Sequence, residues 1–243
     1  DIPFENSTSQ SLALTDDGMT LVVGEPHVKK VSVYRFNGST WSSESVPNPP
    51  ENGSAVHRFG WDVDINSNGE VLIASDPWRA SGADSGSGSV YVYFYDGVSW
   101  ELTSSIEPTE VGYNAYFGFS ISSDSYGSNL VAGAFGYGAS IGINQAGQVR
   151  HYSIDSSLNA YLESTISSSF GNIAGEQFGR IVSISSDGLT FLSGSEYADS
   201  VDTSEGRIEV FENISGTWTL KGQAVDGVQR REGLGTDVAL SGD

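Results

Sequence analysis

The sequence predicts an all-β fold: a β-propeller of four-stranded antiparallel blades, with four complete repeats of a 59-residue period and the first strand of a fifth. Three observations carry this prediction. Apolar residues recur at a fixed interval, each period contains four short strand-like segments separated by turn residues, and no segment shows helical periodicity. The interval is seen most clearly at Val31, Val90, Val149 and Ile208, which follow one another at 59 residues. A β-sandwich, the structural alternative, requires no such period.

The strands are expected in the same order in every repeat. The inner strands are predicted at 11–15, 60–65, 117–122 and 178–184, and the second strands at 21–24, 71–75, 130–134 and 191–195. The third strands are predicted at 31–36, 90–95, 149–154 and 208–213. The outer strands begin at Trp41, Trp100, Tyr161 and Trp218. Asn, Asp and Gly between the first two strands favour tight hairpin turns, because these residues tolerate positive φ.

The chain reads as one propeller or propeller fragment over residues 1–243. Its blades are expected at about 11–49, 57–107, 115–167 and 176–225, followed by an incomplete blade at 232–243. Two explanations of the incomplete blade stay open: a piece of a longer propeller, or a tail that pairs with another chain and gives head-to-tail assembly.

The composition is acidic and free of cysteine. With 31 Asp and Glu against 11 Lys and Arg, the formal net charge is −20. Nucleic-acid binding and docking on anionic lipid both need clustered basic residues, so neither is expected. No apolar run approaches the roughly 20 residues that span a bilayer, so no direct membrane insertion is expected. The absence of cysteine excludes disulfides, thiolate metal sites and a cysteine nucleophile.

A short motif recurs at the start of three of the predicted inner strands. Phe59-Gly60, Phe117-Gly118 and Phe178-Gly179 resemble the Phe-Gly element of FG-GAP repeats, and the segments 22–26 and 131–135 resemble the Gly-Ala-Pro element. This family builds the N-terminal propeller of integrin α chains. The resemblance implies a non-enzymatic extracellular module for adhesion, structure or assembly. In such a module the Phe wedges between blades and the Gly permits close backbone approach.

The same resemblance raises the question of calcium, which integrin-type blades often bind in the hairpin between their first two strands. Asp64, Asn66 and Asn68 have a similar spacing, but the ninth position of the loop falls on Leu72. Calcium requires six to eight oxygen ligands. We therefore expect these hairpins to be metal-free and the protein to have no cofactor, with these three residues as weak Ca²⁺ candidates.

Four sequons favour a secreted or cell-surface glycoprotein, since each can carry a glycan in a eukaryotic secretory pathway. Their asparagines are Asn6, Asn37, Asn52 and Asn213. Protein partners or further copies of the chain are the expected partners, with glycans as a further class.

No catalytic constellation is evident, so no catalytic residue is assigned. The three histidines occupy no common repeat position, and clustered acids in the fourth repeat read as solvated loop charge. Two rival functions remain: a lectin-like propeller that stacks sugars on loop aromatics, and a polysaccharide-acting enzyme with carboxylates gathered on one rim. The residues concerned are His27, His57 and His151; Glu196, Asp199, Asp202 and Glu205; and Trp78, Tyr113, Tyr116, Tyr137 and Tyr197.

Overall fold

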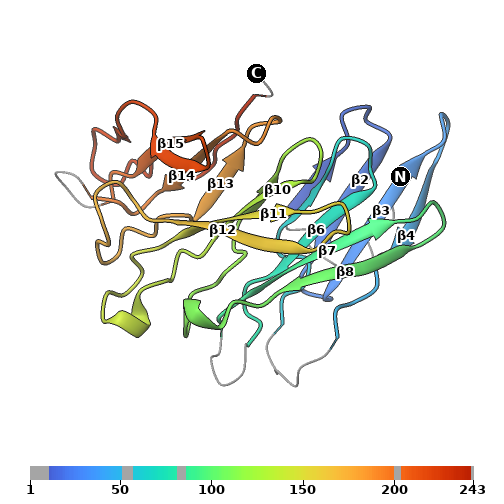
Figure 1. The fold of residues 1–243 in the computed structure, drawn as a ribbon, viewed down its shortest axis with the longest axis horizontal. Helices are drawn as coiled ribbons and strands as arrows, with labels where there is room; N and C mark the ends of the chain where they lie inside the picture. The colour runs from blue at the N-terminus through green and yellow to red at the C-terminus, as the bar shows by residue number, and fades with distance from the viewer. Residues whose placement is uncertain (1–10, 51–56, 81–85, 200–203, 242–243) are drawn as a thin grey trace.

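The computed structural model describes residues 11–50, 57–80, 86–199 and 204–241, which form an all-β molecule of four antiparallel sheets. Each sheet contains four strands in chain order, as the repeat predicts, and the fourth gains a short extra strand. Figure 1 shows the sheets one after another, from the blue sheet at one end to the red sheet at the other. The predicted all-β class and the four-stranded sheets are therefore confirmed.

The strand bounds agree with the sequence period. Sheet 1 contains β1 (Ser11–Leu14), β2 (Thr20–Glu25), β3 (Lys30–Phe36) and β4 (Trp41–Ser45). Sheet 2 contains β5 (Val63–Ile65), β6 (Val71–Asp76), β7 (Ser89–Tyr95) and β8 (Trp100–Ile106). Sheet 3 contains β9 (Ile121–Ser123), β10 (Asn129–Gly133), β11 (Val149–Ile154) and β12 (Ala160–Ile166). Sheet 4 contains β13 (Ile181–Ile184), β14 (Thr190–Ser195), β15 (Arg207–Ile214), β16 (Thr217–Leu220) and β17 (Val225–Asp226).

The first strand of each sheet lies against the first strand of the next, so β1, β5, β9 and β13 are neighbours in that order. Their side chains alternate between the seams of the molecule and a concave surface, which we call the channel face. The 3-10 helix η1 (Thr109–Val111), between sheets 2 and 3, and the 3-10 helix η2 (Ala139–Ile141), in the β10–β11 loop, lie at the lower edge of Figure 1, which we call the loop face.

The Phe-Gly pairs lie at the seams between sheets. Phe59 is 2% exposed and packs between valines of sheet 1 and tyrosines of sheet 2, while Phe117 and Phe178 are fully buried. Gly60 has a φ of 83°, and a Cβ there would lie 2.6 Å from the carbonyl oxygen of Lys30. Close backbone approach therefore requires glycine at this position. The Phe begins no strand, so β5, β9 and β13 start later than predicted.

The predicted first strand of a fifth blade does not form as a strand within residues 232–241. The segment nevertheless lies against sheet 4. Leu234 makes a parallel bridge with Gly206, and the Leu240 backbone N–H donates to the Ser183 hydroxyl at 3.1 Å. Without a second strand beside it, this segment has no partner for a continuous ladder.

Candidate functional site: the channel face

A ladder of side-chain oxygens joins the inner strands across the channel face. The inner strand is the edge of its sheet, so its outward N–H groups need acceptors from elsewhere. Side chains of the preceding sheet supply them: Ser11 accepts from Val63 at 3.2 Å, Asp62 from Ile121 at 2.8 Å, Asp64 from Ser123 at 2.6 Å, Ser120 from Val182 at 3.1 Å and Ser122 from Ile184 at 3.2 Å.

Asp62 occupies the centre of this ladder, immediately before β5. Its Oδ1 accepts the Ser11 hydroxyl at 2.7 Å and its Oδ2 accepts the Ile121 N–H. Burial raises the pKa of this carboxyl to about 6, and the nearby Asp64 adds to the rise, while the hydrogen bonds from Ser11 and Ile121 oppose it. A carboxyl that titrates near neutral pH exchanges protons under physiological conditions.

Asp64 lies two residues further on and on the same face of the extended chain. Its Oδ2 accepts both the backbone N–H and the hydroxyl of Ser123, the latter at 2.9 Å. Burial raises its pKa, with the charge of Asp124 as a smaller contribution. Two carboxyls with raised pKa values therefore stand side by side on one strand of the channel face.

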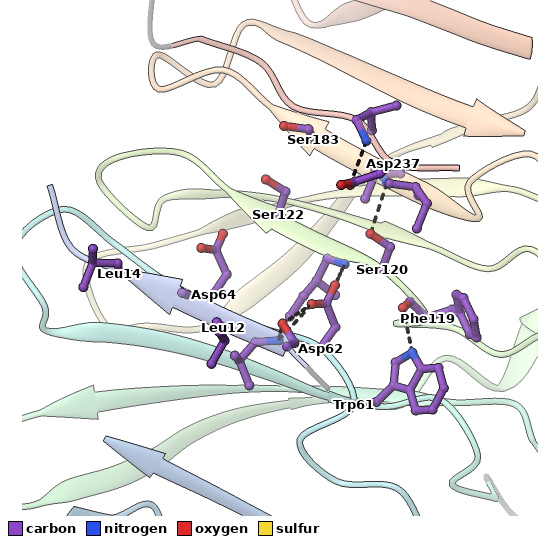
Figure 2. Close-up of a pocket in the computed structure, with 17 residues that line it drawn as sticks. Leu12, Leu14, Trp61, Asp62, Asp64, Phe119, Ser120, Ser122, Ser183 and Asp237 are labelled. Atoms are coloured by element: carbon purple, nitrogen blue, oxygen red, sulfur yellow. Dashed lines mark hydrogen bonds between the residues drawn. The ribbon is translucent and has the colours of Figure 1, made fainter. Parts of the chain in front are cut away.

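Asp62 and Asp64 lie in the wall of a cavity of about 500 Å³. Its floor is formed by the inner strands of all four sheets and by Asp237 and Val238 of the C-terminal segment. Figure 2 shows Asp62, Ser120 and Ser183 contributed by three successive sheets. The volume falls in the range typical of small-molecule sites.

Serine hydroxyl groups line the same cavity, and their O–H donors are unused. The hydroxyl oxygens of Ser120, Ser122 and Ser183 accept backbone N–H groups, and these hydroxyls donate to no acceptor among the described residues. Because a hydroxyl can donate while it accepts, each O–H remains available to a ligand.

An aromatic wall borders the cavity toward the loop face. Trp61 and Phe119 line the cavity, and the Trp61 indole N–H donates to the Phe119 carbonyl oxygen at 3.1 Å (Figure 2). Behind them Trp78 contacts Trp61 with ring centroids 4.4 Å apart. Arg180 lies over the Phe119 ring at 5.1 Å. The wall offers flat apolar surface beside polar groups, the combination that suits a sugar ring.

The weak calcium candidates do not converge. Asp64 points to the channel face, whereas Asn66 and Asn68 lie in the hairpin turn between β5 and β6. The Asn66 amide oxygen accepts the Glu70 and Val71 N–H groups, and that of Asn68 accepts the Glu70 N–H. Within the described residues, no three His, Cys, Asp or Glu side chains are grouped to hold a metal ion.

The loop aromatics are mostly packed rather than free. Trp78 and Tyr116 contact each other with centroids 5.6 Å apart, and Tyr137 packs against the core of sheets 2 and 3. Tyr113 and Tyr197 are 54% and 44% exposed. Trp78 and Tyr116 therefore extend the aromatic wall. Tyr197 adds to it, because the Arg180 guanidinium lies over its ring at 5.2 Å.

The acids of the fourth repeat do not gather into one cluster. Glu196 forms an ion pair with Arg180 at 2.6 Å, Asp199 accepts the Ser204 N–H, and Glu205 is buried. Asp202 lies outside the described residues. The charges therefore serve separate local contacts.

The three histidines are also dispersed. His27 is exposed, and His151 contacts Asn129 at 3.1 Å and the Trp218 ring. His57 is paired with Asp76 at 3.1 Å in the seam between sheets 1 and 2. Only this last pair combines burial with an oriented acid.

Two sequons fall in described turns. Asn37 is exposed in the β3–β4 turn, and Asn213 lies near the end of β15, where its amide oxygen accepts the Gly216 N–H at 2.8 Å. Asn6 and Asn52 lie outside the described residues. The structure describes no helix that is both long and apolar enough to cross a membrane.

The site residues that sequence reasoning missed are Asp62 and the channel serines. A column alignment of the repeats gives the signal, because Asp62 and Ser120 each lie two residues after the glycine of the Phe-Gly pair. The same column holds Ile181 in the fourth repeat and Asp237 in the C-terminal segment, so among the four sheets only sheet 2 has a carboxyl at this position.

Comparison with known proteins identifies the fold but no family. No family model matches the chain, and no curated protein matches it. A solved structure from Bacteroides uniformis named a "putative 6-phosphogluconolactonase" matches with a TM-score of 0.62 and 14% identity, over 91% of this chain and 55% of that one. A periplasmic gluconolactonase from Pseudomonas aeruginosa matches with a TM-score of 0.56 and 18% identity, over 91% of this chain and 55% of its own.

A second structure of the first kind, from Bacteroides fragilis, gives a TM-score of 0.58 and 15% identity over 93% of this chain and 58% of its own. The chain thus spans about half the length of these structures, and identities this low establish the shared fold alone. The neighbours nevertheless correct the sequence analysis. The FG-GAP and integrin resemblance is wrong, and so is the expectation of a non-enzymatic adhesion or structural module, because these neighbours carry lactonase names.

Proposed function

We propose that this chain is part of a β-propeller hydrolase that opens a sugar lactone or a related cyclic ester in the channel cavity. The observation that carries the proposal is Asp62, a carboxyl with a pKa of about 6 in the wall of a cavity of about 500 Å³. The lactonase names of the structural neighbours support the reaction class. The four sheets would form an arc of a ring that further blades complete.

The reaction follows from the groups on the channel face. Above pH 6 the Asp62 carboxylate takes a proton from a water molecule as that water attacks the lactone carbonyl carbon. The carbonyl oxygen becomes an oxyanion, which hydroxyl donors such as Ser120 and Ser122 stabilise. The ring C–O bond then breaks, the Asp62 carboxyl returns its proton to the leaving alkoxide, and the product is a hydroxy acid.

One carboxylate oxygen of Asp62 retains capacity for this role. An ionised carboxylate offers about four lone-pair sites. Oδ1 accepts the Ser11 hydroxyl and the Val63 N–H, and Oδ2 accepts the Ile121 N–H. These contacts fix the orientation of the carboxylate and leave Oδ2 with a free site for the water.

The aromatic wall supports a carbohydrate as the substrate. Trp61 and Phe119 present ring surface to the cavity, on which the C–H face of a sugar can stack while its hydroxyls face Asp62, Asp64 and the channel serines. The high density of hydroxyls and carboxyls on the opposite side suits a polyhydroxylated ligand.

A second candidate reaction, glycoside hydrolysis, is favoured by the spacing of the two carboxyls. Asp62 and Asp64 are two residues apart on one extended segment, which separates them by roughly 6.5 Å along the chain. Inverting glycosidases hold their two carboxyls at about 6.5–9.5 Å. A polysaccharide substrate would use the same aromatic wall.

The test is acid release from glucono-δ-lactone above its spontaneous rate. We expect the chain to accelerate hydrolysis and Asp62→Asn to lower the rate by about 10²- to 10⁴-fold, the usual contribution of a general base. The matched control is Asp96→Asn, an exposed turn aspartate. Turnover of an oligosaccharide without lactone turnover would replace the first reaction by the second, and equal rates for wild type and Asp62→Asn would refute the site.

The remaining expectations stay proposals. They are a secreted or cell-surface location, protein partners that include further copies of the chain, no cofactor, and glycans on the four sequons, at Asn6, Asn37, Asn52 and Asn213. The acidic composition supports the expectation of no nucleic-acid partner.

A further inference from the structure

A second, smaller cavity lies in the seam between sheets 1 and 2, away from the channel face. Its volume is about 30 Å³, enough for a group of a few atoms. Lys29 and Asn48 of the first repeat and His57, Asp76 and Arg79 of the second line it, beside Pro49 and Phe59. It shares no lining residue with the channel cavity.

The centre of this seam cavity is the pair of His57 and Asp76. His57 is 7% exposed and Asp76 is fully buried, with Nδ1 of the imidazole 3.1 Å from Oδ2 of the carboxylate. The Arg58 backbone N–H donates to the other carboxylate oxygen at 2.7 Å. An ionised carboxylate only accepts, so we assign the shared proton to Nδ1 of His57, the ring nitrogen that faces Asp76.

This tautomer makes the other ring nitrogen an acceptor. Nε2 of His57 is buried and has no hydrogen-bond partner among the described residues. A buried acceptor without a donor is unfavourable, so the occupant of the cavity is expected to bring an O–H or N–H group.

The charged side chains around the cavity indicate the charge of its occupant. Arg79 is 4% exposed; its Nη2 donates to the Pro50 carbonyl oxygen at 2.5 Å, and its Nε faces Glu107 at 3.2 Å. The Asp76 carboxylate is already paired with His57 and accepts the Arg58 N–H. Lys29 is exposed and forms no ion pair within the described part of the chain. It is therefore the cation available to an anionic ligand.

We propose that the seam cavity binds the head of a small hydroxycarboxylate, whose hydroxyl donates to Nε2 of His57 and whose carboxylate pairs with Lys29. A hydroxyl beside a carboxylate matches one buried acceptor and one cation at the mouth of a cavity too small for a whole sugar. The inference stands on the seam geometry and does not depend on the reaction assigned to the channel face.

The test is an NMR titration of the chain labelled with ¹⁵N in histidine, using glycolate as the probe. We expect glycolate to shift the His57 Nε2 resonance saturably. Acetate, which lacks the hydroxyl, and ethylene glycol, which lacks the charge, should each bind about 2- to 10-fold more weakly, the effect of losing one interaction.

Lys29→Gln, an exposed substitution that leaves the buried pair in place, should weaken glycolate by a similar factor. His27→Gln, a nearby exposed histidine, is the matched control and should leave the affinity unchanged. Absence of any His57 shift would overturn the proposal. Equal shifts with glycolate and ethylene glycol, unaffected by Lys29→Gln, would also overturn it and leave the cavity as a water site.

Discussion

The seams on either side of sheet 3 perform the same backbone task with different chemistry. Between sheets 2 and 3 a carboxylate, Asp62, accepts the Ile121 N–H, whereas between sheets 3 and 4 a hydroxyl, Ser120, accepts the equivalent Val182 N–H. Serine therefore suffices to join two sheets. A carboxyl held against its desolvation cost, where a neutral hydroxyl would do, indicates a role beyond the seam.

The largest expected effect comes from making the two seams alike. Asp62→Ser should keep the fold, because a serine at 120 already serves the neighbouring seam, yet lower lactone hydrolysis by about 10²- to 10⁴-fold through loss of the general base. Initial rates and urea unfolding of one preparation measure both. A variant that unfolds with its activity per folded molecule intact would reverse this assignment.

The next largest expected effect is on the pH dependence of stability, to which Asp62 contributes and the neutral Ser120 does not. The folded-state pKa of Asp62 is raised from 3.8 to about 6, so its stabilising contribution is complete below pH 4 and is lost as the pH rises through 6. The shift corresponds to on the order of 2–3 kcal/mol.

Unfolding free energies of the wild type and Asp62→Ser, measured from pH 4 to pH 8, should differ by this change. Taking the difference removes the opposite trend of the turn aspartates Asp17, Asp96 and Asp187, whose pKa values are lowered by hydrogen bonds. Parallel curves for the two proteins would show that Asp62 titrates normally.

A substitution in the seam between sheets 3 and 4, where Ser120 is the acceptor, should change stability and leave most of the activity. Ser120→Ala leaves the buried Val182 N–H without its acceptor and should cost about 1–3 kcal/mol of unfolding free energy. Lactone hydrolysis should fall far less than in Asp62→Ser, because other hydroxyls remain in the cavity. A loss of activity as large as that of Asp62→Ser would make Ser120 a catalytic residue.

The smallest effect is expected at the aromatic wall that joins sheets 2 and 3. Trp61→Phe keeps a ring but removes the N–H donor to the Phe119 carbonyl, which should cost about 0.5–1.5 kcal/mol of stability. If sugar stacks on this ring, KM should change more than kcat. Unchanged KM would place the substrate elsewhere in the cavity.

The sequence period predicted the four sheets because hydrophobic alternation and turn residues act locally. Sheet 2 illustrates this: its second strand is predicted at 71–75 and runs over Val71–Asp76. Three of the inner strands, β5, β9 and β13, begin later than the sequence predicts, because the Phe-Gly pair resembles the start of a strand. In the folded chain that pair lies at the seam between sheets, as expected for the Phe-Gly element, and the strand begins after it.

The candidate site lay beyond the reach of the same reasoning. The sequence makes Asp64 only a weak calcium candidate, because Asn66 and Asn68 follow it at regular spacing in a hairpin. In the structure alternation turns Asp64 to the channel, where it accepts from Ser123, 59 residues away. This separation equals the repeat period, so the period relates the two positions, but it does not show that the Asp64 side chain reaches the next inner strand.

The sequence by itself determined the all-β class, the four repeats, the glycines at the seams and the acidic character, because these depend on local backbone preference and composition. Only the tertiary structure decided that Asp62 shares a cavity with serines of the three other sheets and that His57 pairs with Asp76. The pKa of Asp62 rises because the neighbouring sheets remove much of the solvent around the carboxyl, and this desolvation exists only once those sheets are packed together.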